Sequence, residues 1–248
     1  MRLSAGVLSL PKAGTSPREY EDAWACPLPG AQPSPPLRCA MADGASESSY
    51  ARLWAHVLVR AFARGEWDPR QGERSQLDRL RRRWLRIVSR RPLPWHAAEK
   101  VRLGAYATFI GLELLESHGA LVPWRAAALG DSCLFQLRGD EIVRAFPVGS
   151  RRDFPARPFA LCSRPGEEPI VLEIRGQAQA GDSFLMMTDA LGRWFLAQRE
   201  AGGRPWRTLI RLSNLGAPAF ARWVRARRAA GSMGNDDVTF AWLALREV

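Results

Sequence analysis

The 248-residue sequence has no uninterrupted apolar run approaching the ~20 residues that a membrane-spanning helix needs. Its opening residues, 1–10, are too short and too interrupted for a secretory signal peptide. We therefore expect a cytoplasmic protein that does not associate with membranes. Disorder is not expected either, because hydrophobic residues make up 46% of the chain and supply ample material for a packed core.

Cysteine is scarce, with only Cys26, Cys39, Cys133 and Cys162 in the chain. These residues form neither a close pair nor a regular series, which argues against a zinc site and against a disulfide framework. We expect four thiols that serve as small apolar side chains.

Lysine is almost absent, since Lys12 and Lys100 are the only two, and the net charge of +11 therefore comes almost entirely from arginine. Basic side chains neutralise phosphates in nucleic-acid binding. Here the arginines are dispersed, and the denser clusters at 79–91 and 222–228 lie on predicted amphipathic helices, where charge usually forms the solvated face. We do not expect a nucleic-acid partner, although binding through the 79–91 helix stays an alternative that salt-sensitive retention on DNA would favour.

Hydrophobic periodicity predicts both helices and strands. Apolar residues at spacings of three and four predict a helix from a cap at Ser46 or Ser48 to about Gly65, and Gly130-Asp131 and Gly139-Asp140 are typical of hairpin turns. The other predicted helices are 77–88, 96–103, 191–200, 206–212 and 218–228, and the predicted strands are 37–42, 104–114, 124–129, 133–137, 142–146, 170–174, 183–188 and 238–245. Because regular βαβ alternation is missing, we expect an α+β fold of mainly antiparallel sheets with helices on their outer faces, in one domain over 1–248.

Four aspartates, Asp22, Asp43, Asp189 and Asp236, lie where a predicted strand begins or ends. A strand end holds a side chain rigidly and leaves it exposed at the edge of a sheet. Carboxylate and carbonyl oxygens are the ligands that Mg²⁺ and Mn²⁺ prefer, and Gly44 lets the backbone approach a ligand closely. Each aspartate alone also suits a plain turn or a helix cap.

The order of five short motifs is more specific than any one aspartate. They are Glu21-Asp22, Asp43-Gly44, Gly130-Asp131-Ser132, Thr188-Asp189-Ala190-Leu191 and Asp236-Asp237-Val238-Thr239. This order resembles the metal-dependent protein phosphatase family, type 2C, in a compact bacterial-type form, over roughly residues 15–246. Ala190 replaces the usual glycine and Asp237 the usual asparagine, and neither change removes a ligand.

The resemblance implies a central sandwich of two antiparallel β-sheets flanked by helices, with two divalent metal ions, Mn²⁺ or Mg²⁺, at one end. By similarity, Asp43 would bridge the two metals and the Gly44 carbonyl would bind one of them. Asp189 and Asp236 would bind the other. Asp131 resembles the family's structural aspartate and lies outside the expected ligand set.

The resemblance also implies a reaction, in which a metal-bridging water attacks phosphoserine or phosphothreonine directly. Asp22 and Glu21 would hold metal-bound waters, and Arg18 would grip the phosphate, since a guanidinium binds it bidentately. The expected partner is a phosphorylated signalling protein, either the target of a Ser/Thr kinase or the kinase itself, and we expect a monomer. The alternative is a catalytically weak or silent module that keeps the fold and binds phosphorylated partners.

Overall fold

The computed structural model describes residues 2–27, 36–46, 48–90, 95–117, 119–166 and 169–246. The chain folds as two compact units. The first unit comprises Met1–Tyr20, Asp131–Arg157 and Gln179–Val248, and the second comprises Glu21–Gly130 and Pro158–Ala178. No helix within the described ranges is both long and apolar enough to span a lipid bilayer.

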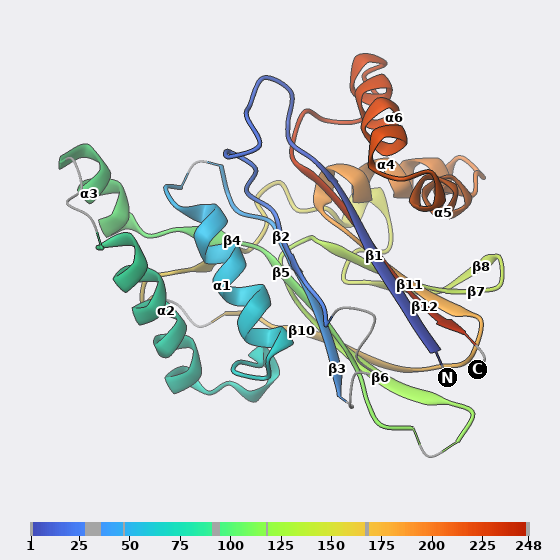
Figure 1. Ribbon diagram of the computed structural model, residues 1–248, viewed down its shortest axis with the longest axis horizontal. Helices are drawn as coiled ribbons and strands as arrows, with labels where there is room; N and C mark the ends of the chain where they lie inside the picture. The colour runs from blue at the N-terminus through green and yellow to red at the C-terminus, as the bar shows by residue number, and fades with distance from the viewer. Residues whose placement is uncertain are drawn as a thin grey trace. The chain divides into compact units, whose positions relative to one another are not determined.

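The first unit is built on a five-stranded antiparallel sheet in the order β1, β12, β11, β7, β8. Its strands are β1 (Arg2–Leu10), β7 (Cys133–Arg138), β8 (Glu141–Phe146), β11 (Asp182–Met187) and β12 (Val238–Arg246), and its helices are α4 (Asp189–Glu200), α5 (Pro205–Leu215), α6 (Ala217–Ala229) and the short 3₁₀ turn η2 (Arg151–Asp153). α4 contacts β12, whereas α5 and α6 contact β1. β1 and β12 pair along their whole length, so the first and last strands of the chain lie side by side (Figure 1).

Aromatic side chains fill the core of the first unit, between its sheet and its helices. Phe135 of β7 and Phe195 of α4 are fully buried, with ring centroids 4.4 Å apart. Trp194, the neighbour of Phe195, meets Trp223 of α6 edge to face at 4.6 Å. Each helix thus buries one apolar stripe and leaves its polar face to solvent, as helical spacing requires.

The second unit is built on another five-stranded antiparallel sheet, in the order β10, β6, β5, β3, β2. Its elements are β2 (Ala23–Ala25), β3 (Leu37–Ala42), α1 (Ala51–Ala63), η1 (Pro69–Gln71), α2 (Arg74–Val88), α3 (Trp95–Leu103), β4 (Tyr106–Ala107), β5 (Phe109–Leu114), β6 (Val122–Leu129), β9 (Leu161–Cys162) and β10 (Leu172–Ala178). α1 lies against β2, β3 and β5, and α2 contacts α1 (Figure 1). β4 pairs with β9 in a small separate sheet.

These sheets and helices confirm the predicted α+β class with two antiparallel sheets flanked by helices. The hairpin predicted at Gly139-Asp140 is also confirmed, because β7 pairs with β8 across it. The hairpin predicted at Gly130-Asp131 is wrong, since β6 belongs to one sheet and β7 to the other, and the chain changes sheets there. The predicted serine cap is wrong as well: α1 begins at Ala51, and the Ser48 hydroxyl instead donates to the Ala45 carbonyl.

Cys26 and Cys39 form a disulfide, which corrects the expectation of four thiols. Ala25 pairs with Ala40 across β2 and β3. Cys26, which follows Ala25, therefore lies opposite Cys39, which precedes Ala40, and their Cα atoms are 4.2 Å apart. Strand register creates this proximity, and a separation of 13 residues in sequence does not reveal it. Cys133 and Cys162 are free thiols.

A buried charge network joins the strands of the second unit. Glu113 of β5 is fully buried, and it lies opposite Arg38 of β3 and Arg125 of β6. Its carboxylate receives Arg38 Nε at 2.8 Å, Arg125 Nε at 2.5 Å and Arg70 Nη2 at 2.5 Å, while Arg70 also binds Asp68 at 2.6 Å. Burial alone would raise the pKa of Glu113, but hydrogen bonds from the three arginines lower it to about 2.

Replacing Glu113 by Gln should destabilise the protein by about 3 kcal/mol, because Arg70, which is 6% exposed, would remain buried with a weakened set of anionic partners. Urea unfolding at pH 7 measures the change. Glu173→Gln is the matched control, since Glu173 lies exposed on β10 of the same sheet. A loss in the Glu113→Gln variant no larger than that in the control would contradict a stabilising network.

The same network predicts a specific loss of stability in acid. The pKa of Glu113 is about 2 in the folded chain, against an ordinary value of 4.5. Its contribution to the free energy of unfolding is therefore complete above pH 4.5 and is lost as the pH falls through 2. Between these limits, wild-type stability should fall more steeply with pH than that of Glu113→Gln, as urea unfolding at several pH values would measure. Parallel pH profiles would count against the assignment.

Candidate functional site

Three aspartates of the first unit lie at one end of adjacent strands. Met187 of β11 pairs with Cys133 of β7, so Asp189, two residues beyond Met187, comes next to Asp131, two residues before Cys133. Asp236 precedes β12, which pairs with β11 on its other side. Antiparallel register thus gathers motif residues that are up to 105 positions apart in sequence.

Hydrogen bonds hold this end of β11 and β12 together. The Thr188 amide donates to the Thr239 carbonyl at 3.2 Å, and the Thr239 amide donates to Thr188 Oγ1 at 3.0 Å. The Tyr20 hydroxyl also contacts the Thr239 hydroxyl, which brings the segment that carries Arg18 to this edge of the sheet. Arg18 itself is exposed. α4 begins at Asp189, where the positive end of the helix dipole favours a carboxylate.

Arg193 is a cation of this cluster that the motifs did not indicate. It lies one helical turn after Asp189, with Nε 3.4 Å from Asp189 Oδ2 and Nη2 3.6 Å from Asp131 Oδ2. Its guanidinium lies 4.2 Å from the centroid of the Phe154 ring. The spacing of four residues on a helix was the signal in the sequence that would have found it.

The carboxyl groups of this cluster are partly buried and lie close enough to repel one another. Burial and then the charge of Asp189 raise the pKa of Asp131 to about 6, against the lowering effect of Arg193. Loss of hydration, with the charges of Asp189 and Asp237, raises the pKa of Asp236. Within the described residues, Asp131 Oδ2 and Asp189 Oδ1 are buried and accept no hydrogen bond. Oxygens of this kind fit a bound cation, whose charge would offset their mutual repulsion.

The other two predicted aspartates lie together in the second unit. Ala23 of β2 pairs with Ala42 of β3, so Asp22 and Asp43 extend the same end of this strand pair. Asp22 is 1% exposed. The Asp43 carbonyl accepts a hydrogen bond of 2.8 Å from the Thr108 amide, which fixes the backbone where β3 ends.

Gly44 is held between two stretches of backbone in the second unit. A Cβ atom at this position would lie 2.9 Å from the Glu21 carbonyl oxygen and 3.0 Å from atoms of Ala51, at the start of α1. Gly44 also bridges to Ala107 of β4. The glycine is therefore required by close packing beside Glu21, and this packing keeps the Asp43-Gly44 turn close to the Glu21-Asp22 element.

The structure thus brings the predicted residues together in two sets, Asp189 with Asp236 in the first unit and Asp22 with Asp43 in the second. Over the part of the chain that the structure describes, no group of three or more His, Cys, Asp or Glu side chains has an arrangement that would hold a metal ion.

No protein-family model matches the chain, and no curated protein matches it in sequence. Solved structures do match it. The serine/threonine phosphatase PstP/Ppp of Mycobacterium tuberculosis is 18% identical, covers 100% of both chains and has a TM-score of 0.56. A bacterial serine phosphatase is 13% identical over 100% of this chain and 99% of its own, with a TM-score of 0.61. The photosystem II phosphatase PBCP is 14% identical over 99% and 100%, with a TM-score of 0.55.

The chain has the fold of the metal-dependent protein phosphatases. The resemblance predicted from the order of five short motifs is thereby confirmed at the level of the fold. Identities of 13–18% establish no more than that, so the roles of individual residues rest on the chemistry of their surroundings.

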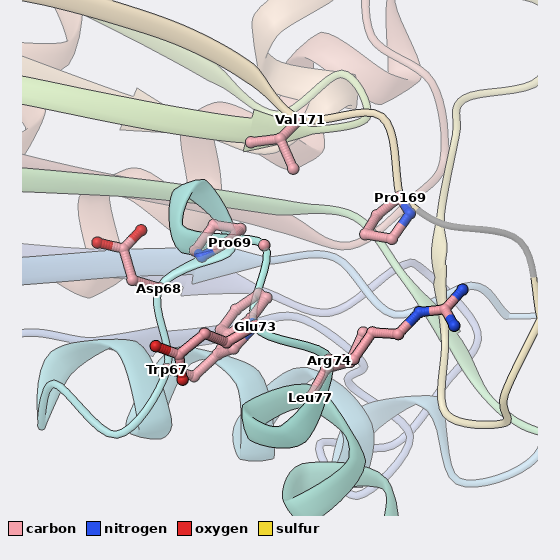
Figure 2. Close-up of a pocket in the computed structure, with 9 residues that line it drawn as sticks. Trp67, Asp68, Pro69, Glu73, Arg74, Leu77, Pro169 and Val171 are labelled. Carbon is pink, nitrogen blue, oxygen red and sulfur yellow. The ribbon is translucent and has the colours of Figure 1, made fainter.

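A pocket of about 100 Å³ in the second unit is not a candidate catalytic site of this phosphatase fold. It is lined by Trp67, Asp68, Pro69, Leu77, Pro169 and Val171, among others, and Figure 2 shows Pro169 and Val171 across from the segment that carries Pro69. Asp68 is already paired with Arg70. The volume is also well below the ~300 Å³ at which small-molecule sites begin.

Replacing Gly44 by Ala should destabilise the metal-free protein by about 1–3 kcal/mol, because backbone atoms on both sides must move to admit the methyl group. Thermal or urea unfolding without added metal measures this effect apart from any ligand role. Gly119→Ala, where a Cβ would meet nothing within 4 Å, is the matched control. Equal stability of the two variants would show that the turn at Gly44 accommodates a methyl group and would contradict the prediction.

Proposed function

We propose that this protein is a metal-dependent serine/threonine protein phosphatase. The observation that carries the proposal is the crowding of the Asp189 and Asp236 carboxylates beside Asp131, where the buried Oδ1 of Asp189 accepts no hydrogen bond within the described residues. The fold shared with serine/threonine phosphatases supports it. One solved structure of PstP, 17% identical with a TM-score of 0.55, is in complex with two manganese ions.

The proposed metal ligands are Asp43, the Gly44 carbonyl, Asp189 and Asp236, for two Mn²⁺ or Mg²⁺ ions. Asp22 and Glu21 would act through water. When bound, such ions neutralise charge on the transferring phosphoryl group and lower the pKa of the attacking water. All of the proposed ligands are oxygens, the donor type that these hard cations prefer.

The remaining roles concern the substrate and the shape of the site. Arg18 would bind the phosphate through its forked guanidinium, and its exposure suits a group that meets the substrate directly. Arg193 would position the carboxylates of Asp131 and Asp189, between which it lies. We further propose that residues 1–248 form a single phosphatase domain, which acts as a cytoplasmic monomer on the target of a Ser/Thr kinase or on the kinase itself.

Replacing Asp43 or Asp236 by Asn should lower Mn²⁺-dependent hydrolysis of an aryl phosphate and of a phosphothreonine peptide by at least about 100-fold. The reason is that removing even an outer partner of a metal ligand costs ~10–100-fold, and a direct ligand should cost more. Calorimetric titration with Mn²⁺ should show weakened binding in both variants, while thermal unfolding without metal should show that both still fold.

Asp78→Asn is the matched control, because Asp78 is a partly exposed aspartate on α2 whose ion pair within the described residues is with Arg81, on the same helix. It should keep full activity. Undiminished hydrolysis in both metal-site variants would refute the ligand assignment. A wild-type protein that binds the phosphothreonine peptide but releases no phosphate would instead identify a catalytically silent member of the fold.

A further inference from the structure

The first unit contains a pocket of about 360 Å³ beside its carboxylate cluster. η2 contributes Arg151, α4 contributes residues between 190 and 198, and the loop that precedes β12 contributes residues 231–234. Its volume falls in the range of ~300–1,000 Å³ that is usual for ligand sites. The pocket therefore has room for a whole amino-acid side chain together with its charged group.

The lining of this pocket is rich in hydrogen-bond donors. Arg151 and Arg193 supply two guanidinium groups, and Gln198 supplies an amide. Trp194 also lines the pocket and is only 5% exposed, yet its Nε1–H donates to no acceptor among the described residues. An indole N–H can only donate, so a buried one without an acceptor is unfavourable until an acceptor is bound.

The charge of the lining is one-sided, because no aspartate or glutamate belongs to it. Arg193 is shared with the neighbouring cluster through its ion pairs with Asp131 and Asp189. Arg151 is exposed, and no ion pair of its side chain is found within the described chain. Glu200 lies close, but it accepts from the backbone amide of Arg151, at 2.7 Å. Two cations and a buried donor together select an anionic oxygen ligand.

We propose that this pocket is a specificity site that binds an anionic side chain of the phosphoprotein substrate, either a carboxylate or a second phosphate, near the residue that is dephosphorylated. This inference rests on the proposed function. Arg193 lines the pocket and also contacts Asp189, so the bound anion would lie about one side chain away from the carboxylate cluster. An extended peptide advances ~3.3 Å per residue, so a nearby flanking residue spans that distance.

The test compares three phosphothreonine peptides that differ only in the residues flanking the phosphothreonine, which are glutamine, glutamate or the non-hydrolysable phosphonate analogue of phosphoserine, since phosphoserine itself would be a substrate of the proposed phosphatase. The wild type should show a kcat/KM at least about fivefold higher for the two anionic peptides than for the neutral one. The preference should shrink at high salt, because the pocket is open to solvent. A higher value for the phosphonate than for glutamate would identify a second phosphate as the ligand, and similar values would identify any anionic oxygen group.

Arg151→Gln should remove most of this preference, and Gln198→Glu, which places a negative charge in the pocket, should reverse it. The matched control is Arg152→Gln. Arg152 is the next residue of η2, it is also exposed and it does not line the pocket, so the preference should remain intact. Retention of the preference in both Arg151→Gln and Gln198→Glu would overturn the proposal, as would equal rates for all three peptides in the wild type.

Failure of the proposed function would be visible separately, as a lack of metal-dependent hydrolysis of both the aryl phosphate and every peptide. In that case the pocket is tested by fluorescence anisotropy with the same peptides, labelled and without metal. Tighter binding of the anionic peptides that is lost in Arg151→Gln would support the pocket by itself. Equal affinity for neutral and anionic peptides would overturn it.

Discussion

The cost of burying a carboxylate is the constraint on which both halves of this protein depend, and the chain meets it in two ways. Glu113 has three arginines around it, and its pKa falls to about 2. Asp131 is also buried, but it has one arginine, Arg193, at 3.6 Å and another carboxylate nearby, and its pKa rises to about 6. Removing one partner from a fully paired buried carboxylate destabilises a fold, whereas an underpaired carboxylate with a raised pKa is typical of functional sites.

Strand register brings these carboxylates together. Asp131 and Asp189 face each other because β7 and β11 are paired neighbours, and Asp22 and Asp43 do so because β2 and β3 are. At β2 and β3 the backbone is held from both ends. The Cys26–Cys39 disulfide closes one end of the pair, and the close packing of Gly44 fixes the end that carries the aspartates. Rigid backbone at this point lets like charges remain close instead of moving apart.

How far the sequence predicts this arrangement depends on the range of the interaction. The helices and most strands follow from local periodicity, and the motif order indicated the fold. The sequence could also have indicated Arg193, because it lies one turn after Asp189 on a predicted helix. By contrast, the sheet change at Gly130-Asp131 and the Cys26–Cys39 disulfide depend on which strands pair, which local patterns do not encode. The approach of η2 to α4 is equally non-local, and it brings Arg151 into a pocket with Trp194.

The excess of arginine is explained better by solvated helix faces and by ion pairs with carboxylates than by a nucleic-acid surface. On α2, the apolar face that includes Leu80 and Trp84 is buried, while Arg79 and Arg82 face solvent, as a solvated helix face requires. Other arginines bind Glu113 or the aspartates of the carboxylate cluster. A net charge of +11 on a protein of this size still attracts anions at long range. Phosphorylated proteins are anionic at the residue that is dephosphorylated. The positive charge that resembles a nucleic-acid signal would therefore raise the rate of encounter with the proposed substrates, most strongly at low salt.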